Sequence, residues 1–154
     1  MVRVKHRYIL CEIVTETHRH FAKLPFVEKT LKEAIIDSVE ELHGDFGLAS
    51  ILPGFAVKMF NRSTRMFILR VHRKFQSVLS TSLPIITSVE NVKLAIKTLH
   101  LSGTIRCAYK FLVNYDKEKL CELRQNYEFS AEDQVLLSSI IEMSQRRMGK
   151  KPQL

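Results

Sequence analysis

The stretch G-F-A-V-K-M-F-N-R-S-T-R-M-F-I-L-R-V-H-R, residues 54–73, carries the pattern that decides the fold. Residues 54–60 and 65–73 alternate in the way that is typical of β-strands, and the four residues N-R-S-T between them are typical of a tight turn. The sequence therefore predicts a β-hairpin with a basic loop, in which Arg62 and Arg65 are candidate RNA contacts.

On the N-terminal side of this hairpin we expect a strand and a helix. Residues 2–14 are rich in β-branched residues and lack Gly and Pro, so they predict a long strand. Residues 15–24 then form a polar loop. A helix is expected from Pro25 to about His43, with Gly44 as its C-terminal cap.

On the C-terminal side the pattern continues with a helix that ends near Pro84, a loop through Glu90 and Asn91, and a strand over residues 93–101. A further helix follows from Ile105. The order β-α-β-β-α-β predicts an α/β (α+β) sandwich, with an antiparallel sheet of RNA-recognition-like or ferredoxin-like order and additional C-terminal helices.

The length of 154 residues suits one domain, which we place at residues 1–147. It includes an appended helix at 130–147, with Ser130 as N-cap and Arg146 and Arg147 in its last turn. Residues 148–154 are expected to be a disordered tail. No apolar run is long enough to span a membrane, and no signal peptide is recognised. Three widely spaced cysteines indicate reduced thiols that fill core space.

The charge of +8 is unevenly distributed along the chain. No acidic residue lies between Asp45 and Glu90, whereas that interval holds six lysines and arginines. Residues 23–45 instead contain three lysines and six carboxylates. This segregation predicts a polarised surface whose positive side binds a polyanion, either nucleic acid or an anionic membrane.

Two further patterns could bind phosphate. In S-G-T-I-R-C-A-Y-K, residues 102–110, Gly103 and Thr104 precede a helix on which Arg106 and Lys110 share one face. An ordinary capped helix with a solvated basic face would look the same. In the first strand Arg3, Lys5 and Arg7 repeat every second residue, which suits either a phosphate backbone or an edge strand protected by charge.

Other functional patterns are incomplete. Residues 53–60 partly imitate the RNA-stacking strand of RNA-recognition motifs, but Pro53, Val57 and Lys58 depart from it, so Phe55 is expected in the core. His18 and His20 lack further ligands for a metal site. No catalytic fingerprint is present, so we predict no metal site and no enzymatic activity of the chain by itself.

Five stretches together resemble the small protein subunit shared by ribonuclease P and ribonuclease MRP of archaea and eukaryotes. The stretches are M-V-R-V-K-H-R-Y-I-L-C-E-I, L-H-G-D-F-G, G-F-A-V-K-M-F-N, S-L-P-I-I-T and T-L-H-L-S-G-T-I-R-C-A-Y-K-F-L, and the whole resemblance covers about residues 1–125 in unbroken order. The resemblance implies an RNA-recognition-related sandwich and a non-catalytic subunit. That subunit binds and stabilises an RNA that removes 5′ leaders from precursor tRNA or processes precursor rRNA.

The resemblance also implies the surroundings of the chain. Its partners would be the ribonuclease P and MRP RNAs, a barrel-type protein subunit and other proteins of the particle, in the nucleus and nucleolus, with no membrane. Magnesium would sit on the RNA, and the protein would bind no cofactor. The expected RNA contacts are Arg3, Lys5, His6, Arg7, Arg62, Arg65, Arg73, Lys74, Gly103, Thr104, Arg106 and Lys110. The alternative is a stand-alone module of RNA-recognition type that binds single-stranded RNA.

Overall fold

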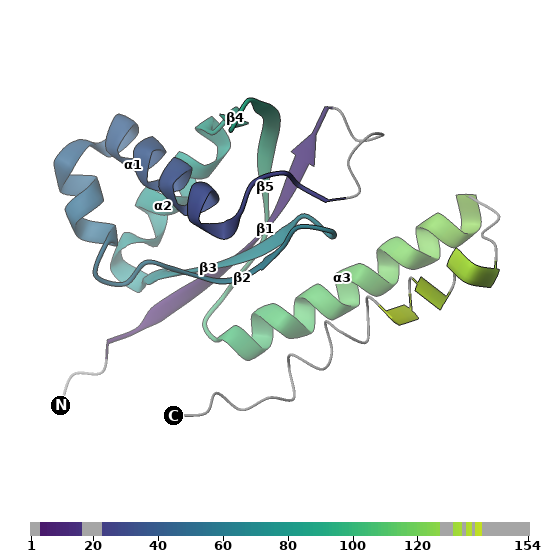
Figure 1. Ribbon diagram of the computed structural model, residues 1–154. Coiled ribbons are helices and arrows are strands. Elements are labelled where there is room, and N and C mark those ends of the chain that lie inside the picture. The colour runs from purple at the N-terminus through teal and green to yellow at the C-terminus, as the bar shows by residue number, and fades with distance from the viewer. Residues whose placement is uncertain (1–3, 17–22, 127–130, 134, 137, 140–154) are drawn as a thin grey trace. The chain divides into compact units, whose positions relative to one another are not determined.

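The computed structural model describes residues 4–16 and 23–126 and, beyond them, 131–133, 135, 136, 138 and 139. The chain divides into two compact units, Met1–Thr104 and Ile105–Leu154, and each is described by itself (Figure 1). The assignment of residues 1–147 to one domain stays a prediction.

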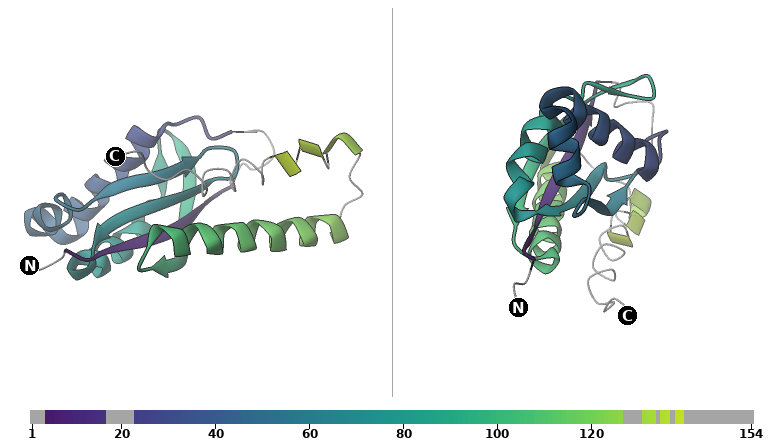
Figure 2. Two further views of the ribbon diagram at one scale, coloured as in Figure 1. Left: turned by 90° about the horizontal axis from the view of Figure 1, so that it is seen from below. Right: turned by 90° about the vertical axis from the view of Figure 1, so that its left-hand side faces the viewer.

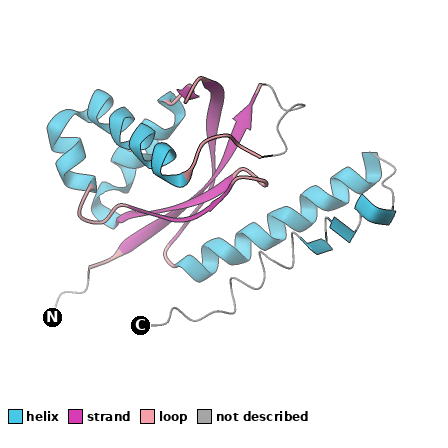
Figure 3. Cartoon of the chain, in the orientation of Figure 1, coloured by secondary structure: helices cyan, strands magenta, loops and turns pink. Residues whose placement is uncertain are grey.

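The first unit is built on a five-stranded antiparallel sheet (Figure 3). Its strands are β1 (His6–Thr15), β2 (Ala56–Asn61), β3 (Met66–His72), β4 (Ser88–Val89) and β5 (Val92–Ser102). They are ordered β2-β3-β1-β5-β4 across the sheet. Helix α1 (Glu28–Ile51) connects β1 to β2, and helix α2 (Gln76–Ser82) follows β3. The predicted β-α-β-β-α-β order is confirmed, with β4 as an addition.

Both helices of this unit cover the same face of the sheet (Figures 1 and 2). The strand residues of that face are buried, as the period of two in β1 predicts for Ile9, Cys11 and Ile13. Leu31 and Ile35 of α1 pack into the same core. The sheet is thereby fixed in register, because a slip by one residue would turn every apolar side chain to the other face.

The hairpin of β2 and β3 closes as the sequence predicts. The Asn61 side-chain oxygen accepts hydrogen bonds from the backbone N–H groups of Ser63, at 3.0 Å, and Thr64, at 3.3 Å. Arg65 completes the turn with a φ of 60°. This Asn-centred turn sets the register of β3 against β2, apart from a shift between Val57 and Met59.

Helix α1 is interrupted directly after His43, where the sequence predicts the end of the helix. At Gly44 the backbone leaves the helical conformation, with φ 63° and ψ −165°, and the chain then resumes a helix that continues to Ile51, which the sequence did not predict. Ile51 is fully buried, so packing of the last turn stabilises the extension beyond the kink.

Two other expectations also needed correction. The loop through Glu90 and Asn91 is a two-residue hairpin turn between β4 and β5, with both residues at positive φ. Cys11 is buried, and burial raises the pKa of its thiol to about 12, but Cys107 and Cys121 are exposed and do not fill the core.

The second unit contains α3, Ile105–Asn126. The predicted N-cap Ser130, the last helical turn with Arg146 and Arg147, and the tail 148–154 lie outside the described residues. No helix in the described part of the chain combines the length and the apolar character that crossing a membrane requires.

Candidate nucleic-acid interface

The first strand presents its basic residues at one end of the sheet. Lys5 is exposed, and its carbonyl oxygen accepts a 2.9 Å hydrogen bond from the backbone N–H of Arg73. His6 and Arg7 begin β1, and Arg7 Nη1 donates to the carbonyl oxygen of His6 at 3.4 Å. Arg3 lies outside the described residues. The start of β1 therefore adjoins the residues that follow β3.

The end of β3 adds a pair of imidazoles and a guanidinium. His72 pairs with His6 in the strand register, and their ring centroids are 4.8 Å apart. Arg70 lies two residues before His72 and thus on the same face of the sheet. Its Nε donates to the carbonyl oxygen of Gly54 at 3.3 Å.

Arg73 and Lys74 continue directly from β3 in a short 3-10 turn, Arg73–Phe75, and both are exposed. Because the Arg73 backbone is bonded to Lys5, the turn is held beside the start of β1. Five residues that the sequence predicted as RNA contacts are therefore brought together here: Lys5, His6, Arg7, Arg73 and Lys74.

The end of β5 reaches the same place. Ser102 pairs with Tyr8, and its hydroxyl donates to the carbonyl oxygens of Tyr8, at 3.5 Å, and Thr104, at 3.0 Å. Arg7 Nη1 lies 3.3 Å from the position that a Cβ on Gly103 would occupy. Gly103 and Thr104 thus adjoin the basic residues of β1.

We call this surface the basic end. Its members lie at the start of β1, at and beyond the end of β3, and in the adjoining part of β2: Lys5, His6, Arg7, Lys58, Arg70, His72, Arg73 and Lys74. Within the described part of the chain, none of its lysines and arginines forms an ion pair with a carboxylate. A group of cations without carboxylate partners attracts a polyanion.

The positive charges of the basic end affect the pKa of His6. The pKa of this imidazole is lowered, first by burial and then by the positive charges of Arg70, His72 and Lys58. These groups all disfavour a further positive charge at that position. A phosphate placed there would act in the opposite direction, so the site favours an anion as its ligand.

Sequence reasoning missed three members of the basic end as site residues: Lys58, Arg70 and His72. They are far from Lys5 in sequence, and only the register of β1, β2 and β3 brings them to it. The signal that could have found them is the hairpin itself, because an antiparallel β2 and β3 place Lys58 near Arg70.

Arg62 and Arg65 lie at the opposite end of β3, separated from the basic end by the seven residues of the strand, or roughly 20 Å. Arg62 donates through Nε to the carbonyl oxygen of Leu24 at 2.7 Å and through Nη2 to that of Pro25 at 2.9 Å. Arg65 Nη1 donates to the Thr15 hydroxyl at 3.0 Å. The structure does not bring these two arginines to the other predicted contacts, and their binding to RNA stays a prediction.

On α3 the basic stripe is exposed as the helical spacing predicts: Arg106, Lys110, Asn114 and Lys117 all face solvent. This stripe belongs to the second unit, which is described by itself. Its role as an RNA contact stays a prediction that needs a test of its own.

Phe55, in the segment 53–60 that partly imitates an RNA-stacking strand, is not a stacking platform. Phe55 is 7% exposed and belongs to the hydrophobic core cluster, which confirms the expectation from the sequence. Base stacking requires an open ring face. The alternative of an RNA-recognition module that stacks bases on Phe55 therefore loses its main residue.

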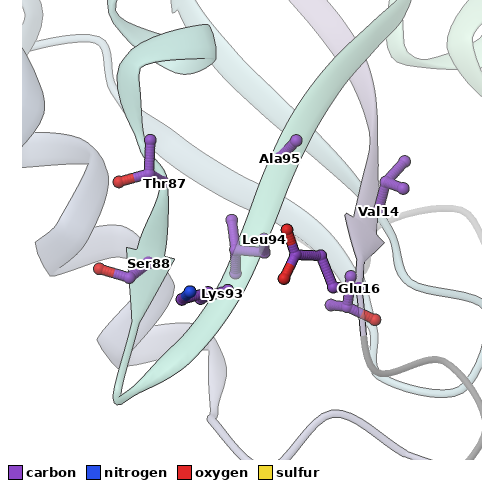
Figure 4. Close-up of a pocket in the computed structure, with 8 residues that line it drawn as sticks. Val14, Glu16, Thr87, Ser88, Lys93, Leu94 and Ala95 are labelled. Carbon is purple, nitrogen blue, oxygen red and sulfur yellow. The ribbon is translucent and has the colours of Figure 1, made fainter.

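Two further features concern a possible metal site and a possible ligand pocket. Among the described residues, no three His, Cys, Asp or Glu side chains lie together so that they could hold a metal ion. A hollow of about 590 Å³ lies near the end of β1 and the β4–β5 hairpin, away from the basic end (Figure 4). Among the described residues, Glu16 and Lys93 are the charged ones that line it, and none of the described predicted RNA contacts does.

Comparison with known proteins identifies relatives over most of the chain. A family model described as the Rpp14/Pop5 family matches residues 7–113. A Bos taurus protein named ribonuclease P/MRP protein subunit POP5 is 37% identical over 144 residues, covering 91% of this chain and 84% of that protein. A Thermococcus gammatolerans protein named ribonuclease P protein component 2 is 32% identical over 115 residues, covering 74% and 88%.

A solved structure is also similar. A chain from the cryo-EM structure of yeast ribonuclease MRP matches with a TM-score of 0.52 and 14% identity, over 96% of this chain and 96% of that chain. At this identity the likeness concerns the fold alone, and it agrees with the α+β architecture described above.

Proposed function

The chain belongs to the Rpp14/Pop5 family, and we propose that it is a protein subunit of the ribonuclease P and ribonuclease MRP ribonucleoproteins. Two independent lines support the proposal. The relatives named above carry the names of such subunits. The basic end has the charge that an RNA-binding protein needs and holds no carboxylate partner among the described residues.

The basic end is the observation that carries the RNA-binding role. Six lysines and arginines lie at this end of the sheet, before or in β1, in β2, in β3 and in the turn after β3: Lys5, Arg7, Lys58, Arg70, Arg73 and Lys74. Contacts to phosphate fix the position of a protein on nucleic acid without reading its sequence. The subunit is proposed to neutralise phosphates of the folded RNA and thus to lower the ion concentration that the RNA needs for activity.

In this proposal the protein supplies no chemical group to the reaction. The RNA holds magnesium ions and carries out the cleavage, which removes 5′ leaders from precursor tRNA or processes precursor rRNA. The purified chain alone is expected to leave precursor tRNA intact. The proposed partners are the two RNAs, a barrel-type protein subunit and other proteins of the particle. The proposed location is the nucleus and nucleolus.

The proposal is tested by the salt dependence of RNA affinity. Each phosphate contact steepens the fall of log affinity with log salt by about 0.7 to 0.9. A triple substitution of exposed cations at the basic end, Lys5→Ala, Arg73→Ala and Lys74→Ala, should reduce the slope by about 2 to 3. The measurement is a filter-binding titration of the full-length protein with ribonuclease P RNA at several salt concentrations.

A matched control loses the same charge elsewhere. Lys23, Lys29 and Lys32 are also exposed and lie before or on the acidic helix α1, so replacing all three with Ala should leave the slope unchanged. Equal changes of slope in both triple variants would mean that affinity follows net charge and that the basic end is not a site.

A further inference from the structure

The motif L-H-G-D-F-G, Leu42–Gly47, is not explained by RNA binding. It lies at the kink of α1, where Gly44 has φ 63° and ψ −165°. A side chain at Gly44 would strain this left-handed conformation. The kink interrupts the helix and redirects the chain for one further stretch that ends at Ile51.

Two other residues of the motif hold the kink against the rest of the unit. A Cβ on Gly47 would come within 2.2 Å of His43 Cβ, so only glycine fits there without a shift of backbone or helix. His43 Nε2 lies 2.8 Å from the Thr81 hydroxyl of α2. Gly44, Gly47 and His43 thus each have a structural role inside the chain.

Phe46 has no comparable role. Phe46 is 78% exposed, which is the highest exposed fraction among the large apolar residues of the described chain. Leu42, four residues earlier, is 45% exposed. Aromatic residues are enriched among the interface residues that contribute most to binding, which makes an exposed Phe a candidate anchor for a partner. The kink therefore presents an aromatic ring outward in a defined position.

The charges near Phe46 in the sequence indicate the kind of partner. Glu40, Glu41 and Asp45 are exposed, and no lysine or arginine of the described residues forms an ion pair with them. Three uncompensated carboxylates repel an RNA backbone. They attract a protein surface that carries lysines or arginines, which complementary charge would also orient.

We propose that Leu42 and Phe46, together with Glu40, Glu41 and Asp45, form a docking surface for another protein of the particle. That partner offers an apolar pocket for the Phe46 ring and a rim of Lys or Arg. The inference rests on the proposed function only because the partner is sought within the ribonucleoprotein. In this proposal the first unit binds RNA at the basic end and binds a protein at the part of α1 that carries Phe46.

The partner protein that binds the docking surface can be identified by photo-crosslinking in the assembled particle. The full chain carrying Phe46→p-benzoylphenylalanine is produced in cells, irradiated, and purified by hybridisation to the particle RNA. We expect a crosslink to a different protein, at a peptide that contains Lys or Arg near apolar residues. The matched control is Val27→p-benzoylphenylalanine, because Val27 is 50% exposed at the other end of α1. That control should give no such product.

A second measurement follows the strength of the contact. Phe46→Ala should reduce the fraction of the chain in the purified particle by about tenfold or more, as expected for a central aromatic contact. Because Phe46 is exposed, the thermal unfolding of the Phe46→Ala variant should be unchanged, and so should the RNA affinity of the purified variant. Val27→Ala should leave all three quantities unchanged.

Several outcomes would overturn the docking surface. These are a Phe46 crosslink to RNA, a crosslink to a second copy of this chain, no crosslink in a particle that contains the chain, or undiminished assembly of Phe46→Ala. A different result would point to the proposed function itself: if the unsubstituted chain binds no ribonuclease P RNA and does not copurify with it, the subunit assignment fails, whatever happens at Phe46.

Discussion

The two ends of β3 both carry basic residues, but they use them in different ways. At the hairpin end, the Arg62 guanidinium bonds to the carbonyl oxygens of Leu24 and Pro25, and Arg65 bonds to the Thr15 hydroxyl. At the basic end, Arg73 and its neighbours have no carboxylate partner among the described residues. Both arginines of the hairpin end thus bond within the fold, whereas the exposed Lys5, Arg73 and Lys74 of the basic end are accessible to a ligand.

This difference teaches that positive charge in a sequence does not identify a binding site by itself. A guanidinium has several donors in a fixed plane, so it can hold two backbone carbonyls of a loop at once, as Arg62 does. At the basic end Arg70 and Arg7 each donate to a single backbone carbonyl oxygen, that of Gly54 and that of His6, so neither holds two carbonyls as Arg62 does. The predictions below test this division of roles, beginning with the largest expected effect.

The first prediction concerns the possibility that the basic end binds RNA through an aromatic surface instead of cations. Phe55 is 7% exposed in the core, so Phe55→Ala should lower the free energy of unfolding by about 3 to 5 kcal/mol. Denaturant titration measures this loss. RNA binding, assayed at a temperature where the variant remains folded, should keep its salt slope. A stable variant that no longer binds RNA would restore the stacking model.

Much of the fold could be predicted because its strands and helices carry strong periodic signals. Ile9, Cys11 and Ile13 alternate as buried strand residues must, and Asn61 supplies the turn of the central hairpin. The two-residue strand β4 could not be predicted, since two residues show no period. The helix beyond Gly44 was missed because a local cap signal gave no information about the burial of Ile51.

The site was predictable only where neighbours in sequence are neighbours in space. Lys5, His6 and Arg7 follow one another, as do Arg73 and Lys74, and both groups are among the predicted contacts, which stay predictions. Arg70 and His72 join them through strand register, which depends on the whole sheet. Arg62 looked equivalent in sequence, since nothing local revealed that the carbonyls of Leu24 and Pro25 would lie beside it.

The second prediction sharpens the comparison at the hairpin end. Arg62→Ala removes a charged donor from two carbonyl oxygens, one of them in a partly buried contact, and should cost about 1 to 2 kcal/mol of stability. The salt slope for RNA should not change. Lys58→Ala, in the same hairpin, should show the reverse: unchanged stability and a slope lower by about 0.7 to 0.9. Thermal unfolding measures the stability of both variants, and filter binding at several salt concentrations measures their salt slopes.

The third prediction extends the comparison to α3. Arg106 and Lys110 are exposed on one face of this helix, so replacing both with Ala should leave stability nearly unchanged. If both contact phosphate, the salt slope should fall by about 1.4 to 1.8. The control is Lys117→Ala together with Asn114→Ala, farther along the same stripe. An unchanged slope in the Arg106 and Lys110 variant would confine RNA binding of the described chain to the first unit.

The last prediction uses the imidazole pair of the basic end, for which the expected effect is smallest. In the free protein the pKa of His6 is lowered by burial and by the charges of Arg70, His72 and Lys58. The unfolded chain therefore takes up a proton at this residue before the folded chain does, and stability should decline as the pH falls below about 6.5. His6→Gln removes that part of the decline, which thermal unfolding between pH 7.5 and about 5.5 can follow.

RNA binding should change with pH in the opposite direction. Phosphates beside His6 would favour its protonated form, so the complex should bind protons and RNA affinity should rise by a few-fold as the pH falls over the same range. The His6→Gln variant should lose this rise but keep most of the salt slope, because the fixed cations of Lys5 and Arg73 remain. At the hairpin end, Arg62→Ala removes no imidazole, so it should leave the pH profile of binding unchanged. A profile that is flat in the unsubstituted protein would place the RNA backbone away from His6 and restrict the basic end to its exposed lysines and arginines.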